Sequence, residues 1–395
     1  MTNETVKGFK DYTEEEAMKK AEIKKLLVRT FENYGFEPAE TPIVEYEEFV
    51  KGENEKDEAV SDIFKLRDKG NRALALRYEF TFQLKRIANN KKLPYRRYQI
   101  GEVFRDEPVT SNRFRQFTQC DIDVIGSTVK DEAEVLAMTK EVLINLGVEP
   151  VILVNNRKLL NEILESEKIK EKDREKVLVE IDKFGKISDE EIKKNLKKYK
   201  AEKVLGVLKK GESYFKKFPA YKEVLELIAY CLYYKVKVLF SPTVIRGLSY
   251  YNGSVFEVKA KGISPQSKIS SSYNSGTNYM KETIVGGGSY LVNGTQSTGI
   301  SFGLERLSGI SKLKRTEKRT LVLSINEDKK AIELAQKLRS SGKNVVILFG
   351  KPTKALDYAN AKGIQEVIFL GKEEVKKKKY KIKNMITGRE TFKGM

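Results

Sequence analysis

Strand-like and helix-like stretches alternate regularly near the end of the chain, and this alternation limits the possible folds more than any other feature. The strand-like runs are short and rich in β-branched residues, and longer stretches with helical spacing separate them. Parallel strands need a crossover of a dozen or more residues, usually a helix, so this order predicts a parallel sheet covered on both faces. The sequence therefore predicts a separate C-terminal α/β domain, with strands at Thr320–Ile325, Asn344–Phe349 and Glu366–Leu370 and helices at Lys329–Ser340 and Thr353–Ala361.

The first part of the chain has a different pattern, in which a long helix precedes several strands. Residues 14–34 carry apolar side chains at helical spacing, and Gly35 ends this predicted helix before the extended run Phe36–Ile43. Turn-forming residues at Asp106–Asn112 predict an antiparallel hairpin between two strand-like runs. The predicted strands are Asn71–Arg77, Arg96–Phe104, Phe117–Ile125 and Val151–Asn155, with a helix at Asp131–Leu146.

Between Arg157 and Glu223 the chain consists of short apolar spacings among many charges, which indicates a helical insertion. Strand-like character then returns. The length of 395 residues fits two to three domains. The strand-like runs after the insertion are Phe240–Tyr251, Ser254–Ala260 and Thr283–Val285, and Ser297–Leu307 has the pattern of a strand that turns into a helix.

The sequence contains no histidine, which excludes several classes of catalytic chemistry. A Ser-His-Asp triad, a Cys-His dyad and a histidine general base all require an imidazole. The remaining groups are arginine, lysine, carboxylates, tyrosine and backbone dipoles. They suit reactions on phosphates, in which the protein mainly positions groups and neutralises negative charge.

The chain is strongly basic, with a formal net charge of +19 and a sequence pI of about 9.4. Such a charge attracts polyanions, so nucleic acid is an expected partner. The alternative is that many surface lysines and glutamates are a general bias of proteins in the source organism, in which case the charge specifies no ligand.

Cysteine content and hydropathy together predict a cytoplasmic location. The two cysteines, Cys120 and Cys231, lie far apart and outside any C-x-x-C spacing, which disfavours a disulfide framework and a thiolate zinc site. No stretch approaches ~18 consecutive apolar residues, and the first residues lack the basic and apolar regions of a signal peptide. We therefore expect no membrane insertion.

The predicted hairpin carries the residues best suited to bind a nucleotide. Arg105 and Arg113 flank its polar loop, so both guanidinium forks can close over a polyphosphate. Glu107 can accept a hydrogen bond from a base, and Phe117 offers a face for stacking it. A charged surface hairpin without a ligand is the alternative. Glycine-rich phosphate loops of the patterns G-x-x-x-x-G-K-[ST] and G-x-G-x-x-G are absent from the sequence.

Several short stretches carry recognisable motifs, namely Thr41-Pro42, Arg105-x-Glu107 with Arg113 and Gln119, Gly303-Leu304-Glu305-Arg306, Ala75–Thr81 and Val244–Glu257. The first three resemble motifs 1, 2 and 3 of the class II aminoacyl-tRNA synthetases, and the last two resemble stretches specific to the histidyl-tRNA synthetases within that class. The hairpin sequence, FRDEP followed by RQFTQCDIDVIG, is similar to archaeal-type members of that family.

The resemblance covers nearly the whole chain and implies its fold and activity. It implies an α+β catalytic domain with a central antiparallel sheet, a helical insertion and a C-terminal α/β domain that binds the anticodon. The implied activity is ligation of histidine to tRNA(His) through histidyl-adenylate, with ATP and Mg²⁺ as cofactors and a homodimer as the assembly. The implied boundaries are 1–156 and 225–312 for the catalytic domain, 157–224 for the insertion, 313–319 for a linker and 320–395 for the C-terminal domain.

The resemblance also implies a role for each matching residue. Carried over position by position, Arg105 contacts the α-phosphate and the substrate carboxylate, and Arg246 lies against the α-phosphate in place of a metal ion. No protein side chain is assigned to a metal. The other implied contacts are adenine at Glu107 and Phe117, the outer phosphates at Arg113 and Arg306, the substrate ammonium at Glu79, Thr81 and Gln119, the two imidazole nitrogens at Asp123 and Tyr251, and the pocket wall at Tyr250.

The residues themselves support this chemistry, although four positions depart from the family pattern. Fixed guanidinium groups favour attack of one anion, a carboxylate, on another, a phosphate. A buried carboxylate such as Asp123 would discriminate an imidazole N–H, because an analogue without that donor leaves the acid unpaired. Tyr78, Ser249, Ser289 and Leu291 depart from the pattern and favour the alternative of a catalytically impaired paralogue that acts as a regulator or RNA-binding protein.

Overall fold

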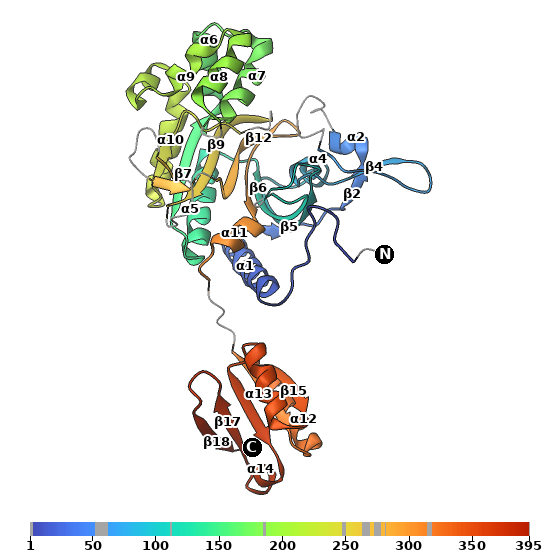
Figure 1. Cartoon of the computed structure of the whole chain (residues 1–395). Helices are drawn as coiled ribbons and strands as arrows, with labels where there is room; N and C mark the ends of the chain where they lie inside the picture. Colours follow the sequence, from blue (N-terminus) through green and yellow to red (C-terminus); the bar gives the residue numbers. More distant parts are fainter. Residues whose placement is uncertain are drawn as a thin grey trace. The chain divides into compact units, whose positions relative to one another are not determined.

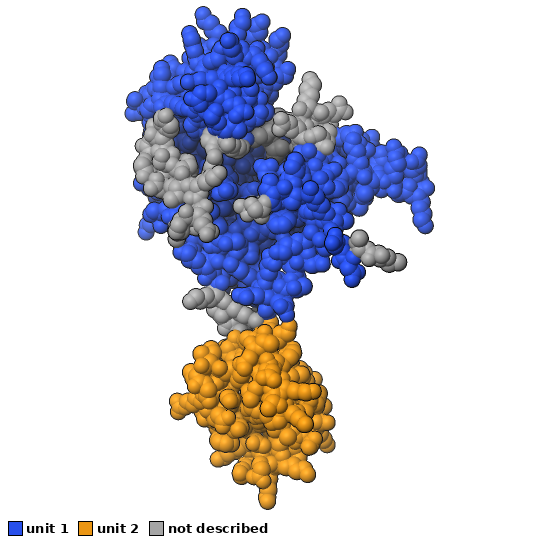
Figure 2. All heavy atoms as spheres, in the orientation of Figure 1, with its two compact units in different colours: residues 1–313 blue, residues 314–395 orange. Residues whose placement is uncertain are grey.

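The computed structural model divides into two compact units. It describes residues 3–51, 62–110, 113–184, 187–246, 250–262, 269–271, 278–280, 282–313 and 318–394. Unit 1 comprises residues 1–313 and unit 2 comprises residues 314–395 (Figure 2). Ser249 and the tip of the hairpin loop, residues 111–112, lie outside the described residues.

A large sheet forms the centre of unit 1 (Figure 1). Among the described residues its strand order is β1-β5-β6-β13-β12-β9-β7-β8. The pairs β1–β5 and β7–β8 at its two edges are parallel, and all pairs between them are antiparallel. The strands are β1 (Glu37–Pro38), β5 (Tyr95–Phe104), β6 (Gln116–Ile125), β7 (Pro150–Asn156), β8 (Val238–Phe240), β9 (Tyr251–Ala260), β12 (Val285–Val292) and β13 (Thr295–Gly303).

Strand β6 shows how the sequence builds the two faces of this sheet. Successive side chains of a strand point to opposite faces. Cys120, Ile122 and Val124 belong to the hydrophobic core, whereas the intervening Asp121 and Asp123 line a pocket. One face of the sheet therefore holds the unit together, and the other carries polar chemistry.

Helices cover the apolar face. The largest hydrophobic cluster contains Ile23, Leu27 and Phe31 of α1, whose spacing of four residues forms one helical stripe. Phe31 packs against Phe302 of β13, with ring centroids 5.8 Å apart. Figure 1 shows α11 beside α1. The helices are α1 (Glu14–Asn33), α5 (Val129–Asn145), α10 (Tyr221–Tyr233) and α11 (Leu304–Ile310).

The expected insertion is helical, and Figure 1 shows its helices gathered at one end of unit 1. Its apolar residues, among them Leu160, Val177 and Leu205, belong to the same hydrophobic cluster as the central sheet. The insertion therefore shares a core with the sheet. Its elements are α6 (Arg157–Ser166), α7 (Glu171–Asp182), α8 (Asp189–Leu196), η1 (Lys197–Tyr199), α9 (Glu202–Leu208) and η2 (Glu212–Lys217).

Two smaller sheets complete the described part of unit 1. One has the order β2-β4-β3 and packs against the short helix α2, and the other pairs β10 with β11. Helix α4 begins at Thr81, directly after Phe80, whose carbonyl accepts a hydrogen bond from Arg97 of β5 at 3.2 Å. The elements are β2 (Val44–Tyr46), α2 (Glu47–Lys51), β3 (Lys65–Arg67), β4 (Ala73–Leu76), α4 (Thr81–Ile87), β10 (Ile269–Ser271) and β11 (Asn278–Met280).

Unit 2 begins with the expected β-α-β-α-β order, and its three parallel strands pair with β14 in the middle. Val322 of β14 packs on α12, and Leu321 and Leu323 pack on α13, so the helices cover opposite faces. Two antiparallel strands follow that the sequence pattern did not predict. The elements are β14 (Arg319–Ser324), α12 (Asp328–Ser340), β15 (Asn344–Phe349), α13 (Pro352–Ala361), β16 (Glu366–Leu370), α14 (Lys372–Lys376), β17 (Lys379–Asn384) and β18 (Glu390–Gly394).

Three further strand predictions were wrong in extent. Of the extended run 36–43, only Glu37–Pro38 pairs, and the Thr41-Pro42 pair lies outside any strand. The run 240–251 is interrupted, because β8 ends at Phe240 and the next strand begins at Tyr251. The strand expected at 283–285 begins at Val285 and continues to Val292.

Candidate active site

On the polar face of the central sheet, glycines leave space that side chains would otherwise fill. Cross-strand pairs place Gly299 beside Asp123 and Gly286 beside Ser301. A Cβ atom at Gly299 would lie 2.2 Å from Asp123 Oδ1, and one at Gly286 would lie 2.5 Å from Arg246 Nη1. Both distances are impossible for real side chains, so these glycines make room for the charged groups.

A pocket of about 250 Å³ opens over this glycine-cleared floor. All twelve residues to which the sequence assigned a role line it, although they come from several strands and loops. Their individual roles stay predictions. These residues are Glu79, Thr81, Arg105, Glu107, Arg113, Phe117, Gln119, Asp123, Arg246, Tyr250, Tyr251 and Arg306.

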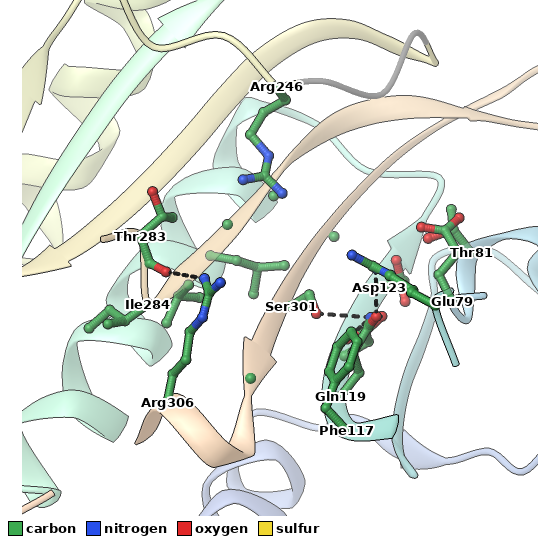
Figure 3. A pocket seen from close by; sticks show the side chains of 18 of the residues that line it. Glu79, Thr81, Phe117, Gln119, Asp123, Arg246, Thr283, Ile284, Ser301 and Arg306 are labelled. Carbon is green, nitrogen blue, oxygen red and sulfur yellow. Dashed lines mark hydrogen bonds between the residues drawn. The ribbon is translucent and has the colours of Figure 1, made fainter. Parts of the chain in front are cut away.

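Four arginines converge on one part of the pocket. In Figure 3 the guanidinium groups of Arg246 and Arg306 point toward each other from opposite sides. Burial lowers the pKa of Arg306, and the positive charges of Arg113, Arg105 and Arg246 lower it further. Because these cations oppose one another, a polyphosphate bound among them would relieve their repulsion.

Arg105 is held in place by aromatic rings and hydrogen bonds. Its guanidinium carbon lies 4.3 Å from the ring centroid of Tyr78 and 5.1 Å from that of Phe117. It also donates to Gln119 Oε1 at 3.0 Å and to the Tyr78 carbonyl at 3.4 Å. Tyr78, a departure from the family pattern, thus supports a central arginine of the pocket.

The hairpin contributes an ion pair at the mouth of the pocket. Arg113 Nη1 lies 3.3 Å from Glu107 Oε2, and the Arg113 side chain is 57% exposed. Because the Arg113 side chain is exposed, the pair contributes little stability, and Arg113 can turn to a ligand at small cost. This geometry is compatible with the roles expected for both residues at a nucleotide.

Glu79 gives the opposite end of the pocket an acidic character. It is buried, and Tyr250 donates to its Oε2 at 3.3 Å, while Oε1 has no hydrogen-bond partner among the described residues. Burial, opposed by the charge of Arg105, raises the pKa of Glu79 to about 7. A buried carboxylate oxygen without a donor is a natural acceptor for a cationic ligand group.

Asp123 has protein partners that sequence reasoning missed. Arg97 Nη2 lies 2.7 Å from Asp123 Oδ2, and the Arg97 side chain is fully buried. The hydroxyl of Tyr290 donates to Asp123 Oδ1. Burial raises the pKa of Asp123, and the charge of Arg97 opposes this. Asp123 lines the pocket as expected, but it also neutralises a cation inside the protein.

Arg97 pairs directly with Asp123 in the β5–β6 register, so strand alternation was the signal for this contact.

Glu305 links three elements behind Arg306. Its carboxylate lies 2.7 Å from Lys20 Nζ of α1 and accepts from the backbone N–H of Thr118 at 3.1 Å and 3.2 Å. Thr118 follows Phe117 directly in β6. The first helix, the hairpin strand and the helix that carries Arg306 are therefore fixed to one another by one carboxylate.

Ser289, another departure from the family pattern, contacts a buried acid. Its hydroxyl donates to Glu132 Oε1 of α5. Glu132 Oε2 has no hydrogen-bond partner among the described residues. Burial raises the pKa of Glu132, and the Ser289 hydroxyl opposes this shift. Ser289 therefore contributes a hydroxyl group and no positive charge to this buried acid.

Relative to the wild type, Glu132→Gln is expected to stabilise the protein more at pH 8 than at pH 5. With a pKa raised in the fold, Glu132 keeps its proton above pH 4.5 while the unfolded chain loses it, so the wild type loses stability as pH rises. Glutamine has no proton to lose. Urea unfolding at both pH values measures the difference, and Glu226→Gln, at an exposed position of α10, is the control. A Glu132→Gln effect that is equal at both pH values would contradict this assignment.

Other candidate chemistry is limited within the described residues. No group of three or more Asp, Glu or Cys side chains there is arranged to hold a metal ion. Both cysteines are buried and free, so they do not form the disulfide that their spacing disfavoured. None of the described helices is long and apolar enough to cross a membrane.

The fold and the pocket together define a class II aminoacyl-tRNA synthetase. Residues 8–307 match the family model of histidyl-tRNA synthetase, and residues 319–393 match that of an anticodon binding domain. The chain belongs to the histidyl-tRNA synthetase family. This confirms the expected fold class.

The chain is similar over its whole length to curated bacterial proteins. It is 35% identical to a histidine–tRNA ligase 1 of Bacillus cereus, and the match covers 99% of this chain and 97% of that protein. It is 31% identical to histidine–tRNA ligase of Wolinella succinogenes, over 98% of this chain and 95% of that protein. These relatives are bacterial, so the expected archaeal type is not supported.

Solved structures share this fold. A histidyl-tRNA synthetase from Nostoc sp. PCC 7120 superposes with a TM-score of 0.82 at 25% identity, over 100% of this chain and 97% of that chain. A protein from Bacillus halodurans, titled ATP phosphoribosyltransferase regulatory subunit/histidyl-tRNA synthetase, superposes at 0.73 with 21% identity, over 93% of this chain and 98% of that chain. The second likeness shows the fold alone.

Proposed function

We propose that this protein is a histidine–tRNA ligase that makes histidyl-adenylate from histidine and ATP and transfers the histidyl group to the 3′-terminal ribose of tRNA(His). Membership of the histidyl-tRNA synthetase family supports the overall activity. The observation that carries the mechanism is the pocket itself, where four arginines occupy one part and buried acids occupy another. This division matches a substrate pair of one polyphosphate and one amino acid.

The arginines supply the chemistry of the first step. The histidine carboxylate attacks the α-phosphorus of ATP, a new C–O–P linkage forms, and the bond to pyrophosphate breaks. Both reacting groups are anionic, so the step needs fixed positive charge rather than a proton acceptor. We assign this charge to Arg105 and Arg246 at the α-phosphate and to Arg113 and Arg306 at the leaving pyrophosphate.

Adenine is assigned to Glu107 and Phe117, close to the arginines that bind the phosphates. Mg²⁺ binds nucleotide phosphates while it keeps several waters, and it needs few protein ligands. We therefore propose that it enters bound to ATP. The arginine cluster fits the remaining negative charge of the triphosphate.

The acids are assigned to the amino acid. Glu79, Thr81 and Gln119 receive the ammonium group, and Asp123 and Tyr251 contact the imidazole, with Tyr250 in the wall. The unpartnered Oε1 of Glu79 supports the first assignment. For Asp123, the hydrogen bond from Tyr290 and the ion pair with Arg97 hold the carboxylate at a fixed position, which favours discrimination by geometry.

We also propose a homodimer that works in the cytoplasm. Ile43, Val44, Tyr46 and Leu66 lie on or beside the β2-β4-β3 sheet and are exposed, which supports burial against a second copy. Two free buried cysteines fit a reducing compartment. The positive charge of the chain supports binding of tRNA with an affinity that falls as salt rises.

Pyrophosphate exchange with each amino acid in turn tests the proposed activity. We expect exchange with histidine and at least about 10³-fold less with the others, because Arg97 and Tyr290 fix Asp123 in one position and a side chain without a matching donor there is rejected. Exchange with a different amino acid would contradict the assignment. Absence of exchange with all twenty would favour the impaired paralogue that the four departures from the family pattern suggest.

A further inference from the structure

Asp121 is a buried carboxylate in the pocket floor to which no role has been given. It lies between Gln119 and Asp123 on the pocket side of β6, it is 5% exposed, and it lines the pocket. Cross-strand pairs place Ser301 of β13 and Gln99 of β5 beside it. A buried acid at this place must either serve a ligand or hold a neighbour.

Asp121 determines how the Gln119 amide is oriented. Gln119 Nε2 donates to Asp121 Oδ2 at 3.0 Å and Oδ1 at 3.2 Å, and also to Ser301 Oγ at 3.1 Å (Figure 3 shows the Ser301 contact). With its N–H groups engaged, the amide presents Oε1 to Arg105. The opposite orientation would place two acceptors, the amide oxygen and the carboxylate, against each other.

Asp121 also decides the charge of this end of the pocket. Asp123 and Arg97 act on the charge of Asp121, and Asp121 and Arg105 act on that of Glu79. The set comprises three acids, Asp121, Asp123 and Glu79, and two bases, Arg97 and Arg105. Burial and then the charge of Asp123 raise the pKa of Asp121 to about 6, and Asp121 in turn raises that of Glu79. This group of charges therefore has one more acid than base, and a ligand cation corrects the difference.

We propose that Asp121 is a further binding residue for the amino acid: it fixes the Gln119 amide and, with Glu79, supplies the negative charge that receives the α-ammonium group. This inference rests on the proposed function. It assigns to the ammonium two carboxylates and one oriented carbonyl, while the imidazole is assigned to Asp123 and Tyr251.

Two competitive inhibitors separate these contributions. Histidinol keeps the imidazole and the ammonium, and imidazolepropionate keeps the imidazole and the carboxylate but has no ammonium. In Asp121→Asn we expect the inhibition constant of histidinol to rise roughly tenfold or more, because a charged contact is lost. The constant for imidazolepropionate is expected to stay within about twofold, since it makes no such contact.

Ser301→Ala is the matched control, because it removes the neutral partner of the same amide and keeps the charge of Asp121. Its effect on histidinol is expected to be smaller than that of Asp121→Asn. Unfolded protein binds neither inhibitor, so the ratio of the two inhibition constants does not depend on how much of a variant is folded. Asp121→Ser, which also removes the charge, serves if Asp121→Asn does not fold. An equal rise for both inhibitors, or a rise for imidazolepropionate alone, would overturn the proposal.

Calorimetric binding of histidinol distinguishes failure of this inference from failure of the proposed function. If the wild type binds histidinol but catalyses no exchange, the proposed function fails, and selective loss of binding in Asp121→Asn still supports the role of Asp121. If the wild type binds neither inhibitor, both proposals are wrong.

Discussion

Arg105→Ala is expected to reduce histidine-dependent pyrophosphate exchange by about 10²–10³-fold, the effect of removing one fixed donor from a developing negative charge. The guanidinium of Arg105 lies close to the rings of Tyr78 and Phe117, and its positive charge lowers the pKa of Arg306. Lysine should recover little of the rate, because an ammonium group cannot reproduce the fork or its stacking. Initial rates at saturating histidine and ATP measure the effect.

Arg115→Ala is the matched control for this experiment. Arg115 lies on the same hairpin, 3.1 Å from Asp106 Oδ1, but it does not belong to the described lining of the pocket. Its replacement should leave the exchange rate within about threefold, because its ion pair is partly exposed and its other contact is with the backbone carbonyl of Glu107, not with the Glu107 carboxylate. If Arg105→Ala exchanged at the rate of the control, the assignment of Arg105 to the reacting phosphate would be wrong.

Arg97→Met is expected to destabilise unit 1 by about 3–5 kcal/mol, the cost of leaving one charge of a buried pair uncompensated. The side chain of Arg97 is fully buried, lies 2.7 Å from Asp123 Oδ2 and donates to the Phe80 carbonyl at 3.2 Å. Hydrogen exchange of β5 and β6 as a function of urea measures this loss in the full chain, separately from unit 2.

The double variant Arg97→Met/Asp123→Leu tests the reason for that loss. With both charges absent, most of the stability should return, because an apolar pair of similar volume replaces the buried ion pair well. The double variant should still lack exchange with histidine. A double variant that is as unstable as Arg97→Met would mean that packing, not charge, explains the effect of the single change.

The sequence predicted much of the fold because buried elements have clear periodicity. In unit 2, β15 and β16 have the expected limits, and both pack their apolar residues against helices. Strands β17 and β18 were missed since lysines occupy alternate positions of the first and every residue of the second is exposed. A strand that buries little apolar surface leaves little hydrophobic signal in the sequence.

The candidate site was predictable where a residue belongs to a recognisable local motif. Arg105, Arg246 and Arg306 stand in such motifs, and all three line the pocket. Arg97 and Tyr290 do not, because their importance depends on contacts with Asp123 across the sheet. Such contacts follow from strand register and side-chain direction, which a single sequence specifies only weakly.

With Asp123 assigned to the imidazole, its contacts also restrict how the amino acid preference of this protein could change during evolution. A replacement at position 123 alone would leave the buried charge of Arg97 without its partner, so the variant would lose stability before it gained a new specificity. A compensating change at Arg97, on the neighbouring strand β5, would have to accompany it.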